Sequence, residues 1–397
     1  MRITQGTGQA QFLAAVAALE SGINQTQNQI SSNSSFTTAA QNPIAAGEVN
    51  NYKQTLAQSQ QFSTNANSAQ TNLSTEDNAM SQVQNQLQSL RSLALEANSG
   101  TLTASDRTAI ATQVQQIQNS LLALANTQNG GGEFIFSGFS TQTQPFALTA
   151  GGASYAGDQG QRQIQIAPGQ SVADGDSGDS VFNQIKTGNG TFAVSANAAN
   201  AGTGLIGSTT VSDSTQYDGG TYTIKFATAG TYQVLDSANN VVTAGNYTDG
   251  TTISFKGLQV ALSGAPATGD TFTVSPSTNQ SLFGTVQTLV GALSSGTTST
   301  SSSTALGNTI GDVINNLDQA ITHFSDVRAS IGGRLNSITA QQSVATSQQT
   351  QLKSSISSLQ GLDYAQAITQ LDQQNTTLSA ALQAYTLTQG LSLFKYL

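Results

Sequence analysis

The sequence predicts an α+β protein in which long helices from both ends of the chain form antiparallel coiled coils around an inserted antiparallel β domain. The five prolines lie at positions 43, 145, 168, 266 and 276, so residues 44–144 and 277–397 have none and can form long helices. In both stretches apolar residues recur at alternating spacings of three and four. Between about 150 and 275 the pattern changes to short runs bounded by Gly, Asp and Asn, which is typical of strands and turns.

The clearest helical seam predicts the first arm of a helical hairpin. Its members are Ala66, Ala69, Leu73, Glu76, Met80, Val83, Leu87, Leu90, Ala94 and Ala97. One of them, Glu76, is charged. Asn98-Ser99-Gly100 ends this arm, and Thr103 with Asp106 three residues later forms a capping box that begins a second one. The second arm carries Ile110, Val114, Ile117, Leu121 and Leu124 and ends at Asn129 and the glycines that follow it.

Beyond the hairpin, the chain changes to strands and then returns to helices. Residues 134–139 are aromatic and β-branched, which predicts a strand, and further strands are expected at 222–226, 232–235, 252–255, 258–262 and 271–274. Helical spacing returns at 282–293 and, after a flexible Ser/Thr run at 294–304, in a seam over 310–359. Arg328, Gln342, Ala345 and Gln349 occupy intervening positions of that seam, so it weakens through the middle and needs partners there. Gly361 ends it, and Asp363 with Gln366 begins the last helix.

Each end of the chain carries an apolar stripe that we interpret as a subunit-assembly surface. The stripes contain Phe12, Val16, Leu19, Ile23, Ile30, Ile368, Leu371, Leu378, Leu382 and Tyr385. An isolated amphipathic helix is marginal in water, so the two ends are expected to pack on one another and on neighbouring subunits. Residues 12–19 have the length of a signal-peptide core, but the stripe continues to Ile30, so a retained helix is expected and not a cleaved signal.

These patterns divide the chain into three parts. We expect terminal helices at 1–42 and 361–397, a helical rod domain at 43–142 and 277–360, and the inserted β domain at 143–276.

The composition argues against several kinds of partner. Charged residues make up 8% of the chain, against about 25% in an ordinary soluble protein. The net charge is −9, and the twelve Lys and Arg residues form no basic cluster, so a nucleic-acid partner is not expected. No apolar run is long enough to span a bilayer, so no membrane partner is expected. Helices with so few charges must be stabilised by apolar packing, which favours self-assembly.

The sequence offers little for catalysis, metals or cofactors. There is no cysteine, and His323, the only histidine, lies on the C-terminal seam. Residues 174–179 hold three aspartates, but the downstream Glu of a calcium loop is missing. No phosphate-binding glycine loop is present. We therefore expect no catalytic residue, no metal and no cofactor, and a protein that is not an enzyme.

Several segments resemble the hook-associated protein 3 family of the bacterial flagellum. They are Met1-Arg2-Ile3-Thr4, Asn42-Pro43-Ile44-Ala45-Ala46, Asn98-Ser99-Gly100-Thr101-Leu102-Thr103 with Asp106-Arg107, Gly132-Glu133-Phe134-Ile135-Phe136-Ser137-Gly138, Gly178-Asp179-Ser180-Val181-Phe182, Arg328-Ala329-Ser330-Ile331-Gly332-Gly333-Arg334-Leu335-Asn336 and Leu362-Asp363-Tyr364-Ala365-Gln366-Ala367. Their order and spacing extend over nearly the whole chain.

The resemblance implies a flagellin-like architecture, with the terminal helices in an inner tube, the helical rod around it and the β domain outside. It further implies an extracellular structural subunit that leaves the cell through the flagellar export channel. Such a subunit joins the hook side to the filament at the hook-filament junction. Its implied partners are other copies in a ring, the neighbouring hook-associated junction protein, flagellin, and an export chaperone on the C-terminal helix.

Two alternatives remain open. A flagellin, the filament subunit itself, shares the architecture, although residues 1–4 and 391–397 look more like the junction protein. A β-domain adhesin on a helical stalk is the other alternative, and its candidate ligand residues are Tyr217, Tyr222, Tyr232 and Tyr247.

Overall fold

The computed structural model describes residues 2–100, 102–228, 230–296 and 299–390, and the chain forms two compact units. One unit contains residues 1–64 and 341–397, and the other contains residues 65–340. Segments 1–4 and 391–397 favoured the junction protein over flagellin in the sequence; of these, residues 1 and 391–397 lie outside the described residues. None of the described helices is long and apolar enough to span a membrane.

In sequence, the strands lie between helices from the two ends of the chain. The helices are α1 (Arg2–Ser32), α2 (Pro43–Ala97), α3 (Ala104–Ala125), α4 (Leu282–Ser294), α5 (Thr300–Gln360) and α6 (Tyr364–Gly390). The breaks between α1 and α2 and between α5 and α6 lie beside the expected boundaries at 42 and 361. The α+β fold class, with long terminal helices around an inserted antiparallel β domain, is confirmed.

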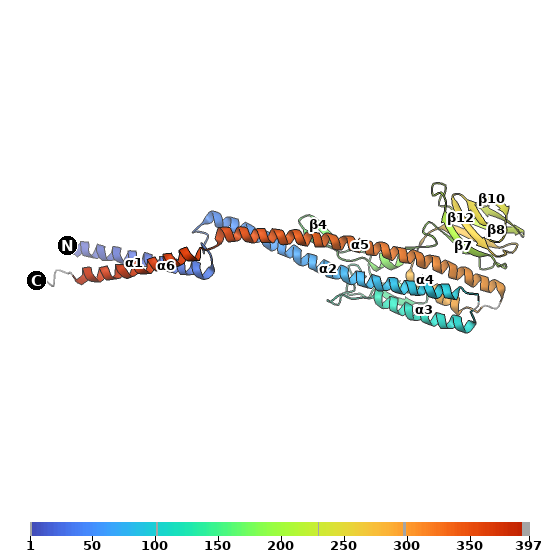
Figure 1. Cartoon of the computed structure of the whole chain (residues 1–397), viewed down its shortest axis with the longest axis horizontal. Coiled ribbons are helices and arrows are strands. Elements are labelled where there is room, and N and C mark those ends of the chain that lie inside the picture. The colour runs from blue at the N-terminus through green and yellow to red at the C-terminus, as the bar shows by residue number, and fades with distance from the viewer. Residues whose placement is uncertain (1, 101, 229, 297–298, 391–397) are drawn as a thin grey trace. The chain divides into compact units, whose positions relative to one another are not determined.

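The β domain consists of two antiparallel sheets with one apolar core between them. Its strands are β6 (Phe192–Ala196), β7 (Leu205–Val211), β8 (Tyr222–Thr228), β9 (Thr231–Leu235), β10 (Val241–Asn246), β11 (Thr252–Phe255), β12 (Leu258–Ser263) and β13 (Thr271–Pro276). One sheet has the order β10-β9-β8-β13-β6, and the other has the order β11-β12-β7. Figure 1 shows the strands β7, β8, β10 and β12 grouped beside α5. Phe226, Val260 and Phe272 are fully buried in the core. All five strands expected between 222 and 274 are present.

Three two-stranded sheets lie outside the two sheets of the β domain. Two are hairpins, formed by β1 (Phe146–Thr149) with β2 (Gly152–Tyr155) and by β3 (Gln163–Ala167) with β4 (Gln170–Ala173). In the third, β5 (Ile185–Lys186) pairs with β14 (Asn279–Gln280), so the segments that enter and leave the β domain lie side by side. A one-turn π-helix, η1 (Asp179–Asn183), lies between β4 and β5.

Two sequence-based expectations about local structure are wrong. Residues 134–139 form turns and not a strand, with a single bridge between Phe134 and Gln128. Phe136 is buried there, and Gly138 adopts a φ of +70° in contact with Asp158, so the chain turns where a strand would continue. The Ser/Thr run 294–304 is partly helical, because α5 begins at Thr300.

The heptad seam of α2 is confirmed at every position. All ten members from Ala66 to Ala97 are buried, and so are Ile310, Leu317 and Phe324 on α5. The capping box of α3 is also present: Thr103 Oγ1 accepts from the N–H of Asp106, and Asp106 accepts from the N–H of Thr103.

Polar positions in the long seam find polar partners on α2. Arg328 donates from Nε to Asp77 Oδ1 at 2.8 Å and from Nη1 to Gln84 Oε1 at 2.8 Å. In the other unit, Gln349 Nε2 donates to Ser63 Oγ at 2.9 Å. The sequence predicted that the seam of α5 needs partners where it weakens. At Arg328 and at Gln349 these partners are residues of α2.

Phe182, on η1, lies at the centre of an aromatic cluster that ties the loops to the helices. Its ring centroid lies 5.3 Å from that of Phe136, 5.2 Å from Phe146, 6.0 Å from Phe283 and 5.4 Å from Phe324. These partners come from a turn, from β1, from α4 and from α5. Pairs of this geometry add stability beyond the area they bury.

We expect Phe182→Ala to lower the free energy of unfolding by about 3–5 kcal/mol, because it removes the shared ring and leaves a cavity. Phe139, whose side chain is 64% exposed, provides the control, since Phe139→Ala should change stability by less than about 1 kcal/mol. Urea denaturation followed by circular dichroism measures both. Equal effects of the two substitutions would contradict the central position of Phe182.

Glu76 is the one carboxyl group in the α2 seam, and it is 1% exposed. Its Oε1 accepts from the N–H of Asp176 at 3.2 Å, whereas Oε2 has no partner. Burial raises the pKa of Glu76 well above its usual value; nearby Asp176 raises it further, and Arg334 lowers it only in part. The folded state therefore favours the protonated form.

Because the folded pKa is raised, the stability that Glu76 contributes is present at acid pH and is lost as pH rises through that pKa. We expect Glu76→Gln, which imitates the protonated form, to be more stable than the parent chain at pH 8 and to match it near pH 4. Glu96→Gln, at an exposed position of the same helix, should change stability equally at both pH values. Thermal unfolding across this range measures the difference, and parallel curves for all three chains would refute the buried-acid interpretation.

Candidate assembly surface

The terminal helices α1 and α6 pack side by side and run antiparallel (Figure 1). The rings of Phe12 and Tyr385 stack with centroids 4.1 Å apart and planes 5° from parallel. Further along, Thr26 Oγ1 donates to Gln374 Oε1 at 3.1 Å. The residue numbers of the partners increase along α1 and decrease along α6, as expected for antiparallel helices. The two contacts define the register of the pair.

The helix junction next to this pair is closed by its own small cluster. Backbone N–H of Ser35 donates to the carbonyl oxygen of Gln360 at 2.8 Å. Phe36, Ala45, Ala46 and Val49 are buried there against Ile356 and Leu359. Asn42 Oδ1 accepts from the N–H of Ala45 at 3.1 Å, so the Asn-Pro element caps the start of α2.

The ten predicted assembly residues fall into two groups. Most lie on the face where α1 and α6 meet: Ile23 is buried, and Phe12, Val16, Leu19, Ile30, Leu371, Leu378 and Tyr385 are half-buried. Ile368 and Leu382 are 50% and 46% exposed. Ile368 and Leu382, fourteen residues apart on α6, are therefore apolar surface that packing within this chain leaves open.

Sequence reasoning missed the polar and small members of this seam. Thr26 is buried, continuing the alternation of Ile23 and Ile30, and Ala367 is buried on α6. Gln374 and Ala381 are half-buried at the next seam positions of α6. Alternating spacings of three and four counted from Leu371 identify Ala367, Gln374 and Ala381 as seam positions. The prediction from large apolar residues chose Ile368 and Leu382 instead, each one residue away from a seam position.

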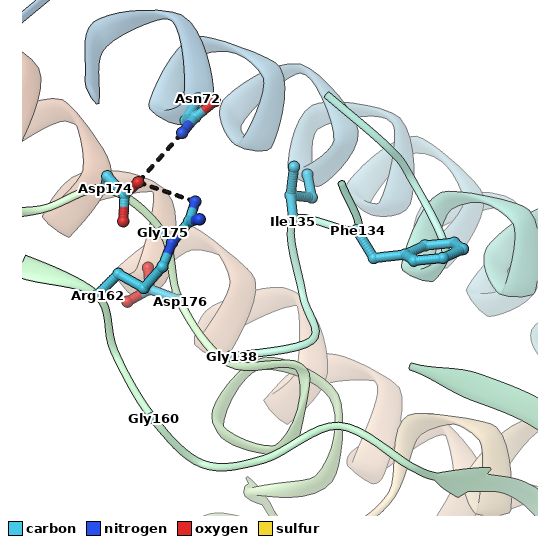
Figure 2. A pocket seen from close by; sticks show the side chains of 9 residues that line it. All are labelled: Asn72, Phe134, Ile135, Gly138, Gly160, Arg162, Asp174, Gly175 and Asp176. Carbon is cyan, nitrogen blue, oxygen red and sulfur yellow. Dashed lines mark hydrogen bonds and ion pairs between the residues drawn. The ribbon is translucent and has the colours of Figure 1, made fainter. Parts of the chain in front are cut away.

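The Asp-rich segment 174–179 is occupied by contacts within the chain. Figure 2 shows Asp174 accepting from Asn72 Nδ2 at 3.1 Å and pairing with Arg162 Nη2 at 2.9 Å. Asp176 pairs with Arg334. The hollow beside this turn measures about 20 Å³, space for about one water molecule. Within the described ranges, no group of three His, Cys, Asp or Glu side chains is arranged to hold a metal ion.

The other candidate chemical groups also bond inside the protein. His323 Nε2 lies 3.0 Å from the carbonyl oxygen of Ser180, an acceptor, so Nε2 carries the hydrogen. Tyr222 and Tyr247 are buried, and their hydroxyls donate to Asp218 and to the carbonyl of Gly264. The hydroxyl of Tyr217 donates to the carbonyl of Gly220, and Tyr232 packs partly buried against the β-domain core.

The α1–α6 packing gives a test based on two leucines four residues apart. We expect Leu378→Asp to weaken the helix pair by about 1–2 kcal/mol, because it places a charge on the half-buried seam. Amide hydrogen exchange along α1 should then be faster by about five- to thirtyfold. The same change at exposed Leu382 should leave exchange along α1 unaltered, and faster exchange in both variants would contradict the assigned register.

Comparison with known proteins places this arrangement among flagellar proteins. Residues 6–141 match the family model of the bacterial flagellin N-terminal helical region, and residues 314–397 match that of the C-terminal helical region. Residues 195–276 match the D2-like domain of flagellar hook-associated protein 1. The family models thus cover both helical ends and the β domain separately.

Curated relatives and solved structures agree with these matches. Flagellar hook-associated protein 3 of Escherichia coli is 32% identical over 157 residues, which are 40% of this chain and 49% of that protein. The chain thus spans about half the length of the curated relatives it matches. FlgL of Xanthomonas campestris is 36% identical, with 76% of this chain and 99% of that chain covered and a TM-score of 0.70. The flagellar junction protein FlgL of Legionella pneumophila is 29% identical, with 79% and 100% covered and a TM-score of 0.71.

Proposed function

The chain belongs to the flagellar hook-associated protein 3 (FlgL) family, and we propose that it is the structural subunit that joins the hook side of a bacterial flagellum to the flagellin filament. The observation that carries the proposal is the 36% identity to Xanthomonas FlgL over 99% of that chain. The flagellin-type helical regions at both ends supply the second argument, because a junction subunit must meet flagellin with surfaces of a related kind.

The mechanism is mechanical. Terminal helices of successive subunits associate, so that a ring of these chains continues the tube from the hook-associated protein before it to the flagellin after it. Ile368 and Leu382 supply apolar surface for this step, because half of each side chain remains exposed after α1 and α6 have packed. Burying such side chains between subunits stabilises the contact by about 25 cal/mol for each Å² of apolar surface removed from water.

The β domain supports the junction role over the two alternatives. Its match to the D2-like domain of flagellar hook-associated protein 1 associates it with hook-associated proteins. The adhesin alternative has little support, because the hydroxyls of Tyr217, Tyr222 and Tyr247 bond within the domain.

Before assembly, the same helices are the part of the chain that needs protection. Along α6, Ala367 is the one described side chain that is fully buried, so this helix is poorly stabilised alone. We include in the proposal an export chaperone that covers α6, passage through the flagellar channel with α1 retained, and a role without enzymatic activity.

Deleting the gene in the source bacterium tests the junction role itself. We expect hooks without filaments and unpolymerised flagellin in the medium, seen by electron microscopy with antibodies against filament protein. Filaments of normal length would exclude the junction role. Absence of the filament protein altogether would identify the chain as flagellin.

Replacing Ile368 and Leu382 together by Asp tests the surface. We expect loss of filaments, with the variant still folded and still secreted, because two charges on an apolar contact oppose association. Val241→Asp, at an exposed valine of the β domain, is the control and should leave filaments normal. Normal filaments in the double variant would remove Ile368 and Leu382 from the assembly surface.

A further inference from the structure

The turn that contains Asp174 and Asp176 lies against α2 and brings two buried carboxyl groups to one place. Asp174 is 4% exposed and Glu76 is 1% exposed. One oxygen of each is already bonded: Asp174 Oδ2 accepts from Asn72 and Arg162, and Glu76 Oε1 accepts from the N–H of Asp176. The second oxygens, Asp174 Oδ1 and Glu76 Oε2, are buried and have no hydrogen-bond partner among the described residues. They can therefore accept from a donor or coordinate a cation.

Gly175 leaves open the space beside these oxygens. A Cβ atom added at Gly175 would lie 3.8 Å from Glu76 Oε2 and 3.6 Å from the carbonyl oxygen of Ile135, which is ordinary contact distance. Asp174, Gly175 and Ile135 also line the hollow of about 20 Å³ (Figure 2). Two carboxyl groups and one backbone oxygen thus border a space that holds about one ligand the size of water.

The charges around this hollow do not balance. Four carboxyl groups and two guanidinium groups form the cluster. They belong to Glu76, Glu133, Asp174, Asp176, Arg162 and Arg334. Four negative and two positive charges leave a net charge of −2 when all six groups are ionised. Because unbalanced buried charge is costly, Glu76 must gain either a proton or a cation.

We propose that this hollow is a calcium site, in which Glu76, Asp174 and the carbonyl oxygen of Ile135 are the protein ligands. Ca²⁺ takes hard oxygen ligands in flexible geometry and tolerates water among them. Water can reach the hollow past Gly160 and Gly175, which line it and are half-buried. Mg²⁺ demands octahedral geometry and keeps several of its waters, and a hollow of this size has no room for them.

The ligand set explains why the sequence gives no sign of the site. Residues 174–179 lack the downstream Glu of a calcium loop, and the carboxylate that the structure supplies instead is Glu76, from the seam of α2. The third ligand is a backbone oxygen and not a third acidic side chain. With so few protein oxygens the site should be weak, with a Kd of about 10⁻⁴ to 10⁻³ M. Bound calcium ties α2 to the turns at Ile135 and Asp174.

Thermal unfolding of the full chain tests the site. We expect about 10 mM calcium to raise the melting temperature of residues 65–340 by about 2–8 °C relative to the same chain in EDTA. Magnesium at the same concentration, and sodium chloride at the same ionic strength, should raise it by less than about 1 °C. Each chain is compared with its own calcium-free state, so that the effect of a substitution on stability cancels.

Two substitutions should abolish the calcium response by different routes. Glu76→Gln keeps the shape of the side chain and removes its charge. Gly175→Ala fills the space with a methyl group, and Gly175 does not have the positive φ that would strain an alanine. Asp326→Asn, at an exposed position of α5, is the control and should respond to calcium as the parent does.

Isothermal titration calorimetry of the parent chain gives a direct measurement that no variant is needed for. We expect saturable calcium binding with one site and a Kd in the range given by the ligand count. The calcium site is overturned if no saturable binding is detected up to about 10 mM, or if magnesium raises the melting temperature as much as calcium does. A calcium response that persists in both Glu76→Gln and Gly175→Ala would also overturn it, because the ion would then bind elsewhere.

Discussion

The packing of long, nearly uncharged helices along an alternating three–four seam is the interaction on which this structure depends. Charges make up 8% of the chain, so lattices of ion pairs along the helix surfaces cannot supply the stability. In α2 the seam is continuous from Ala66 to Ala97 and completely buried. Helices α3 and α4 and the aromatic cluster around Phe182 add to this buried face. The loops and hairpins thus pack against the apolar face that the long helices form.

The same seam is weaker at the ends of the chain, and this difference supports the assembly surface that we propose there. Between α1 and α6 the seam includes Thr26, Ala367, Gln374 and Ala381, which remove less apolar surface from water than leucines do. Several of its large residues are only half-buried, and Ile368 and Leu382 stay exposed. A helix pair that leaves apolar surface exposed is stabilised further when it packs against other copies of the chain.

The sequence predicted the features that depend on local residue patterns. It missed the features that depend on contacts between segments far apart in the sequence. The α2 seam, the Thr103–Asp106 capping box and five strands followed from spacing and turn residues alone. Residues 134–139 looked like a strand, but Phe136 is drawn into the cluster of Phe146 and Phe182, which no local pattern reveals. Similarly, the sequence predicted that the large side chains of α6 face α1. The register of the two helices depends instead on the contact between Thr26 and Gln374, which the apolar pattern does not reveal.

The distribution of ion pairs differs between the two units. Among the side chains that the structure describes, every ion pair lies within residues 65–340, where Asp77, Asp174 and Asp176 pair with arginines that hold loops and α5 in place. In residues 1–64 and 341–397 the described contacts are apolar or between neutral polar groups, apart from the Asp363 carboxylate, which accepts from the N–H of Gln366 at the start of α6. Salt screens exposed charges over about 8 Å at physiological ionic strength, whereas apolar and amide contacts are little affected. The proposed assembly surface, built from such contacts, should therefore depend less on ionic strength than one built from ion pairs.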